Sequence, residues 1–124
     1  MTDQQIEAEI QAKGLTAARV TPEQIASVIV HEQYFTARDG AEGACLGGGT
    51  YPEALGLLTF CVLTLKNGFT VTGESACASP ENFDAEVGQK VARANAVSKI
   101  WPLEGYLLKQ ALYETSLPHY IPPV

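Results

Sequence analysis

The residues with the most chemistry to offer are three cysteines and two histidines. Cys45, Cys61 and Cys77 are widely spaced, and His31 and His119 are far apart in the chain. Structural zinc sites normally use close cysteine pairs, and Cys61 and Cys77 are sixteen positions apart. An odd number of cysteines without framework spacing also argues against disulfides. We therefore expect free thiols in a reducing compartment, no metal and no cofactor.

Cys77 is the thiol best placed to react, because it precedes the expected start of a helix, where thiol pKa values fall. Nucleophilic catalysis also needs a base, and the sequence places no histidine beside it. Cys61 lies in a strand that is apolar on both sides, so we expect it to pack. The prediction is therefore no catalytic residue, and a small enzyme using Cys77 stays open as an alternative.

The segment Gly73–Pro80 is small and polar, and it joins an expected strand to an expected helix. Backbone amides at a helix start can hold an anion. A ligand site there would draw on four candidates: Glu74, Ser75, Cys77 and Ser79. The other interpretation is a tight connection in which Ser79 caps the helix, and it is the favoured one.

Two aromatic residues complete the candidate ligand-binding set. Trp101 stands beside Pro102, and Tyr106 follows about one helical turn later. Such a pair could anchor a partner, although Trp101 also continues an apolar stripe, which favours core packing. The Gly47–Gly49 run is not a phosphate loop, because no Lys-Ser/Thr pair follows it.

Two helices are expected at the start of the chain. Thr2 and Gln5 form a capping box, and Gly14 suits the left-handed position that ends a helix in a Schellman motif. Thr21 is a candidate N-cap, Pro22 fits the first helical position, and Gln24 completes a second capping box.

We expect the second helix to end near His31, because the β-branched residues before it lower the helix propensity. A short strand is expected over Gln33–Ala37. Residues 38–56, rich in glycine, are expected to form a long loop. Leu57–Leu65 gives the clearest strand pattern. Because both of its faces are apolar, we expect this strand to be central in the sheet and covered on both faces. Asn67–Gly68 predicts a two-residue hairpin turn into a strand at Phe69–Ala76.

Two further helices follow. Ser79 and Pro80 predict the first helix start, as N-cap and first helical residue. One apolar stripe is expected to face the core: Phe83, Val87, Val91, Ala94 and Trp101. Pro102 should break this helix and open the next, whose apolar face consists of Leu103, Leu107, Leu108, Ala111 and Leu112. The Pro-rich tail, residues 117–124, cannot continue the helix.

The element order is therefore α-α-β-β-β-α-α, and the expected fold class is α+β, a three-stranded antiparallel sheet packed by helices. A chain of 124 residues with 46% hydrophobic and 18% charged residues suits a single domain over residues 1–124. Its core is the Leu57–Ala76 ribbon, against which the helix of Phe83–Trp101 should lie.

Charge excludes some partners. The net charge is -6, with eight acids and three bases in residues 1–56. This argues against direct nucleic-acid binding, which needs clustered Lys and Arg, and against an anionic membrane surface. No secretory signal is visible, and the apolar run Leu55–Leu65 is too short to span a bilayer.

Most of residues 19–112 closely resembles a family of small tailed-phage proteins, named after gene product forty-nine of one enterobacterial phage and gene sixty-six of another. The matching motifs are RVTPEQI at Arg19–Ile25, EQYFTA at Glu32–Ala37, NGF at Asn67–Phe69, GESAC at Gly73–Cys77, PENFD at Pro80–Asp84 and IWPLEGYLL at Ile100–Leu108. The resemblance implies a phage or prophage origin and the cytoplasm of an infected bacterial host. It implies no activity and no catalytic residue.

The sequence therefore favours a phage or prophage accessory protein that is a non-catalytic binding protein rather than an enzyme. It would act on a host or phage factor, or sequester a small ligand. The alternatives are the small enzyme described above, using Cys77 or a helix N-terminal anion site, and a minor virion or assembly component. Unpaired edges of a three-stranded sheet would also allow a homo-oligomer.

Overall fold

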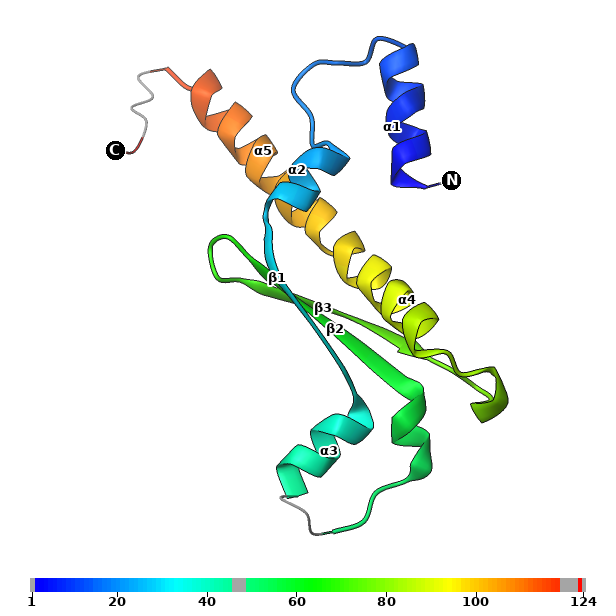
Figure 1. Ribbon diagram of the computed structural model, residues 1–124. Coiled ribbons are helices and arrows are strands. Elements are labelled where there is room, and N and C mark those ends of the chain that lie inside the picture. Colours follow the sequence, from blue (N-terminus) through cyan, green and yellow to red (C-terminus); the bar gives the residue numbers. More distant parts are fainter. Residues whose placement is uncertain (1, 46–48, 119–122, 124) are drawn as a thin grey trace. The chain divides into compact units, whose positions relative to one another are not determined.

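The computed structural model describes residues 2–45, 49–118 and 123, which group into two compact units (Figure 1). The first unit combines the start of the chain, up to Ser27, with the segment that begins at Ile100, and the second spans Val28–Lys99. The expected single-domain organisation stays a prediction. Of the features singled out above, His119, most of the Gly47–Gly49 run and most of the tail lie outside the described residues.

The second unit is built on a three-stranded antiparallel sheet. Strands β1 (Ile29–Thr36), β2 (Leu58–Leu65) and β3 (Thr70–Ala76) lie in the order β1-β2-β3, so β2 is central. In the register, Cys61 is opposite Tyr34 on one side and Gly73 on the other. The predicted α+β class and three-stranded antiparallel sheet are confirmed.

Side chains of β2 alternate strictly in burial. Thr59, Cys61, Leu63 and Leu65 are buried, and this face of the sheet packs against helix α4 (Ala85–Ser98). The intervening side chains stay partly exposed. The expectation that β2 is covered on both faces is therefore wrong for the described residues, whereas its central position is confirmed.

Helix α4 presents its smallest residues to the sheet, where Gly88, Ala92 and Ala96 are buried. A side chain at Gly73 on β3 would clash with the backbone of Ala92 and Ala96, so helix and strand approach until their backbones touch. The predicted core stripe is wrong, because its two valines are 57% and 44% exposed, namely Val87 and Val91. A row of small residues allows closer packing than valines do, so the small row faces the sheet.

The start of α4 also differs from the prediction. Ser79 and Pro80 open a short 3₁₀ helix, η2 (Pro80–Asn82), and Ser79 makes no side-chain capping bond. Asp84 is the N-cap of α4, and its carboxylate accepts the Val87 N–H at 3.0 Å. The carboxylate supplies the acceptor that the first turn needs, so the helix begins five residues later than predicted.

The β2–β3 hairpin has a three-residue loop. The Leu65 carbonyl accepts the Gly68 N–H, and the Leu65 N–H donates to the Phe69 carbonyl, both at 2.8 Å. Gly68 has a φ of 88°, which suits a turn followed by a left-handed glycine. The turn lies where the Asn67–Gly68 pair predicts it, but it is one residue longer, because Lys66 joins the loop.

Around β1 the structure is more regular than predicted. Helix α2 (Pro22–Ser27) ends before His31, and β1 replaces the expected short strand at Gln33–Ala37. The expected loop over residues 38–56 instead contains helix α3 (Ala37–Cys45) and the 3₁₀ helix η1 (Glu53–Leu57).

The first unit consists of α1 (Asp3–Ala12), α2 and α5 (Ile100–Ser116), and its buried apolar side chains are Ile25 and Ile100. The capping box of Thr2 and Gln5 is present. Gly14 has a φ of 68°, and the Leu15 N–H donates to the Ile10 carbonyl, which confirms the Schellman ending. The break before α5 falls at Lys99 rather than at Pro102, since Pro102 fits inside the first turn of α5.

Candidate functional site

Of the three hollows described here, the largest lies in the second unit, at the end of the sheet where β2 begins. It has a volume of about 460 Å³ and is open to solvent. Its floor is apolar, with Leu57, Pro80 and Phe83 among the lining residues, and the charged side chains of Arg38 and Glu53 also line it. We call this the Phe83 hollow.

A smaller hollow of about 180 Å³ adjoins it and shares Leu57 and Phe83. It lies where α4 begins, and the hydroxyl-bearing residues Thr59 and Ser75 line it together with Cys77. Both hollows combine apolar residues with a few polar groups, which is the usual composition of a binding site.

Of the four candidates within Gly73–Pro80, two therefore meet at this site and two do not line it. Ser75 and Cys77 line the smaller hollow. Glu74 projects from the opposite face of β3, since neighbouring residues of a strand alternate in direction, and its carbonyl accepts the Asn95 side-chain amide. Ser79 contributes its carbonyl oxygen, which accepts the Cys77 thiol at 3.1 Å.

Within the described part of the chain, the hydrogen bonds of Cys77 go only to backbone groups and to no histidine. Its thiol donates to a backbone carbonyl, and its N–H donates to the Leu57 carbonyl at 3.0 Å. His31 is opposite Thr64, at the other end of the sheet. At about 3.3 Å per residue along β2, His31 lies roughly 23 Å from the Cys77 end.

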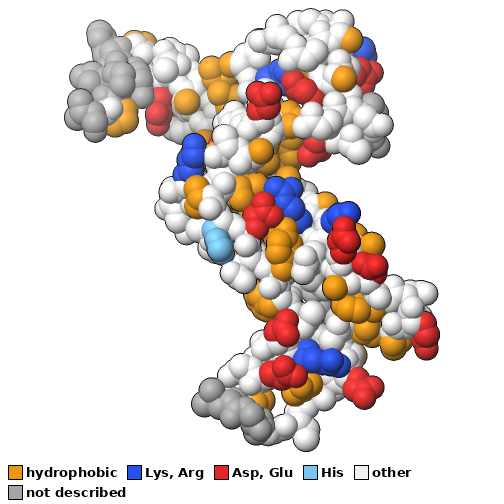
Figure 2. All heavy atoms as spheres, in the orientation of Figure 1, with side chains coloured by type: hydrophobic (Ala, Val, Ile, Leu, Met, Phe, Trp, Pro, Cys, Tyr) orange, Lys and Arg blue, Asp and Glu red, His pale blue; other side chains and the backbone are white. Residues whose placement is uncertain are grey.

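Arg38 is a site residue that the sequence analysis missed. It lies in the first turn of α3, and its guanidinium covers Gly56 so closely that a side chain there would touch it. A signal was present in the sequence: Thr36 and Asp39 cap α3 reciprocally, at 2.9 and 3.1 Å. A threonine followed three residues later by an acid is the pattern of a capping box. Figure 2 shows a basic side chain among acidic ones near α3.

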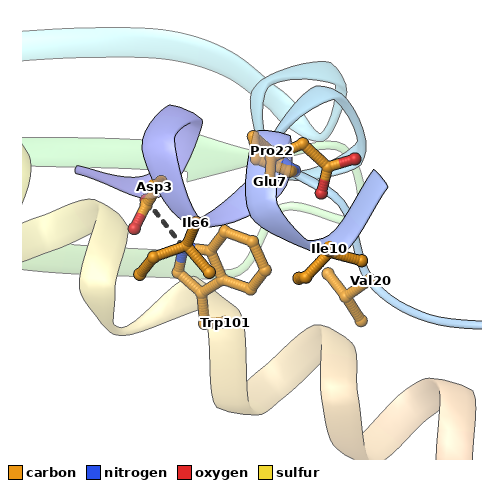
Figure 3. Close-up of a pocket in the computed structure, with 7 residues that line it drawn as sticks. All are labelled: Asp3, Ile6, Glu7, Ile10, Val20, Pro22 and Trp101. Carbon is orange, nitrogen blue, oxygen red and sulfur yellow. Dashed lines mark hydrogen bonds between the residues drawn. The ribbon is translucent and has the colours of Figure 1, made fainter. Parts of the chain in front are cut away.

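A third hollow, of about 270 Å³, lies within the first unit beneath α1. Trp101 forms one wall, and Ile6 and Ile10 of α1 face it (Figure 3). The indole N–H donates to the Asp3 carboxylate at 3.2 Å. Trp101 is thus half-buried in this helical unit, and it is not part of a core stripe shared with Phe83.

Glu7, which lines the same hollow, forms an ion pair with Arg19. The two terminal guanidinium nitrogens of Arg19 each donate to the Glu7 carboxylate at 2.6 Å. These hydrogen bonds, together with one from Gln11, lower the pKa of Glu7 from its ordinary 4.5 to about 2. The pair ties α1 to the segment that precedes α2, so its role is structural.

A second polar cluster joins α4 to the edge strand β1. Arg93 donates to the Glu32 carboxylate at 3.0 and 3.2 Å, and the Tyr34 hydroxyl donates to it at 2.7 Å. The Arg93 hydrogen bond lowers the pKa of Glu32, and burial raises the pKa of the neighbouring Cys61 thiol. Cys61 is fully buried, as predicted for a packing residue.

Tyr106, the last candidate, projects from α5 and is 71% exposed. It lines none of the three hollows described above. Among the described residues, no three His, Cys, Asp or Glu side chains converge on a point where a metal ion could bind. No described helix combines the length and the apolar character that crossing a membrane requires.

Comparison with known proteins identifies the family. The family model described as the Phage protein (N4 Gp49/phage Sf6 gene 66) family matches residues 20–112, which include the Phe83 hollow, and the chain belongs to this family. No curated protein and no solved structure matches the chain.

Proposed function

We propose that this member of the N4 Gp49/Sf6 gene 66 phage family is a non-catalytic binding protein that engages a host or phage protein in the cytoplasm of the infected bacterium. The observation that carries the proposal is the Phe83 hollow. Its volume of about 460 Å³ lies within the range of binding sites, and the adjoining hollow extends it.

The composition of the site favours a protein partner. An apolar floor bordered by a few charged side chains is the arrangement of a protein interface, in which arginine is enriched. Arg38 and Glu53 bring one charge of each sign, so neither a strongly anionic nor a strongly cationic ligand is favoured. A partner's apolar side chain can fill the floor while its polar groups meet Arg38 and Glu53.

The same geometry supports binding rather than catalysis. Cys77 is the best nucleophile candidate at the site, but its hydrogen donor is engaged by the Ser79 carbonyl. A general base must lie within hydrogen-bond reach of the nucleophile, and His31, the histidine among the described residues, belongs to the far end of the sheet. If the protein is an enzyme after all, Cys77→Ser will abolish its effect on infection; the binding proposal expects Cys77→Ser to behave as wild type.

The experiment compares two matched variants of the tagged protein in infected cells. Ala78→Arg places a long charged side chain in the Phe83 hollow, whereas Ala94→Arg places the same side chain on an exposed position of α4. Affinity purification and mass spectrometry should recover a partner protein with wild type and Ala94→Arg. We expect at least a tenfold loss of this partner with Ala78→Arg.

Two outcomes would contradict the proposal. Equal recovery of the partner with both variants would show that the hollow is not the binding surface. A small molecule released from the purified wild-type protein on denaturation, and absent from Ala78→Arg, would identify the hollow as a ligand site and replace the protein partner. Circular dichroism of both variants checks that each is folded.

A further inference from the structure

Helix α5 carries apolar side chains on two opposite faces. At 100° per residue, Trp101, Glu104 and Leu108 share one side, which is the side held to α1 and α2 by the Trp101–Asp3 and Gln24–Glu104 hydrogen bonds. On the opposite side the large apolar side chains are exposed, whereas Gln110 is partly buried. The apolar face of a helix normally packs against another element, so we expect a partner on the second face as well.

The exposed face forms a regular stripe. Its residues follow one another at alternating intervals of three and four positions: Leu103, Tyr106, Gln110, Tyr113 and Leu117. This is the spacing of the a and d positions of a coiled coil, over two heptads. Leu107 widens the face at an e position. We define the α5 stripe as its apolar members: Leu103, Tyr106, Leu107, Tyr113 and Leu117.

The area of the stripe suits a partner of the same size. Its five side chains are between 37% and 71% exposed, which leaves roughly 500 Å² of apolar surface on each copy. A standard interface buries about 800 Å² on each partner, of which the apolar core is only a part. Lys109 and Glu114 border the stripe, and Gln110, which donates to Glu114 at 2.9 Å, lies within it; these side chains can supply the polar remainder.

Charges beside the stripe select one arrangement of two copies. Lys109 occupies a g position and Glu114 the following e position, which face each other between the helices of a parallel coiled coil. Within the described residues Lys109 forms no ion pair, whereas two parallel copies would form the Lys109–Glu114 pair twice. An antiparallel pair would place Lys109 near Ser116 and Glu114 near Leu107. In the parallel pair, Gln110 of one copy would contact Gln110 of the other at the central a position. A polar residue at such a position fixes the register of the two helices.

We infer that the protein forms a parallel homodimer through the α5 stripe. The inference is independent of the proposed binding function, since the stripe shares no residue with the Phe83 hollow. Two heptads with one polar layer form a weak interface, so we expect a dissociation constant between about 1 and 100 µM.

Sedimentation equilibrium on the full chain is the first measurement, with two matched variants. Wild type should approach twice the 13.3 kDa of one chain at high concentration. Leu107→Ser removes a stripe residue and should raise the dissociation constant about tenfold or more. Leu112→Ser makes the same change at a residue that is also exposed but lies off the stripe, and should change the dissociation constant less than about twofold.

Charge reversal and cross-linking test the parallel arrangement. Lys109→Glu should weaken the dimer, and adding Glu114→Lys should restore it. In a Cys45→Ser background, which removes the exposed native thiol, Leu103→Cys should form a disulfide-linked dimer, because residues at one a position meet in parallel helices. In antiparallel helices the two thiols would be roughly 20 Å apart.

Three results would overturn the inference. A wild-type chain that stays a monomer at about 100 µM would remove the homodimer and leave the stripe to a different protein. Equal effects of Leu107→Ser and Leu112→Ser would place the interface elsewhere. A dimer that Leu103→Cys fails to cross-link would exclude parallel helices.

Discussion

At the scale of single residues, the Glu7–Arg19 pair shows how one contact can depend on tertiary position. The two residues are twelve apart in sequence, and two hydrogen bonds of 2.6 Å join them beside the hollow beneath α1. Bidentate, charge-assisted hydrogen bonds from a guanidinium favour the ionised form of the carboxylate. The pair therefore stabilises the fold only while Glu7 is ionised.

The first prediction is a pH dependence of stability from Glu7. Its pKa falls from 4.5 to about 2 on folding, so its contribution is complete above about pH 4.5 and is lost as the pH falls through about 2. Carboxyl NMR of the folded protein should find Glu7 still ionised at pH 3. In Arg19→Gln the Glu7 pKa should return towards 4.5, and a wild-type Glu7 that titrates near 4.5 would show that the pair does not form in solution.

At the scale of elements, the packing of α4 on the sheet depends on the absence of a side chain at Gly73. Gly73 on β3 has no side chain, and Ala92 and Ala96 present backbone to it. Val87 and Val91 on the same helix stay at the surface. The sequence pattern of large apolar residues therefore pointed to the wrong face, because close backbone contact contributes more packing than two valine side chains held further away.

The second prediction follows from this contact. Gly73→Ala should destabilise the protein by about 2–3 kcal/mol, since helix and strand must separate to admit one methyl group. Gly40→Ala is the control: it lies in α3 with nothing within 4 Å of the added carbon, and better helix propensity should stabilise it by up to about 1 kcal/mol. Urea unfolding of both variants is the measurement. Unchanged stability of Gly73→Ala would contradict the close approach.

At the scale of the whole molecule, the two compact units differ in how much they bury. The second unit holds Cys61, Leu63, Ala92 and Ala96, all fully buried. In the first unit only Ile25 and Ile100 are buried among the described apolar residues, and α1 buries none. Burial of apolar surface is the main source of stability, so the second unit should be the more stable one.

The third prediction is a gradient of amide hydrogen exchange. The amides of β2 should exchange slowest, because this strand is paired on both sides and every second side chain is buried. The amides of α1 should exchange fastest among the helices of more than eight residues. Hydrogen–deuterium exchange at neutral pH, followed by mass spectrometry of peptides, measures these exchange rates. Equal protection of α1 and β2 would contradict the difference between the units.

Local patterns could be predicted where a short stretch of sequence contains both partners of an interaction. Thr2 and Gln5, Gly14, and the turn around Gly68 each lie where their residue types require. The strand at Leu58–Leu65 is similarly evident from its composition. The candidates Ser75 and Cys77 were found because they belong to the small polar segment at the junction between a strand and a helix, and both line the smaller hollow.

The sequence by itself determined the α+β class, the central strand and the family, because these depend on residue types read in order along the chain. Only the tertiary structure decided which face of α4 is buried and that Arg38 joins Phe83 around one hollow. Residues 38 and 83 have no local relation. They meet because the sheet brings α3 and the start of α4 to the same end, and pairing of distant strands cannot be read from neighbouring residues.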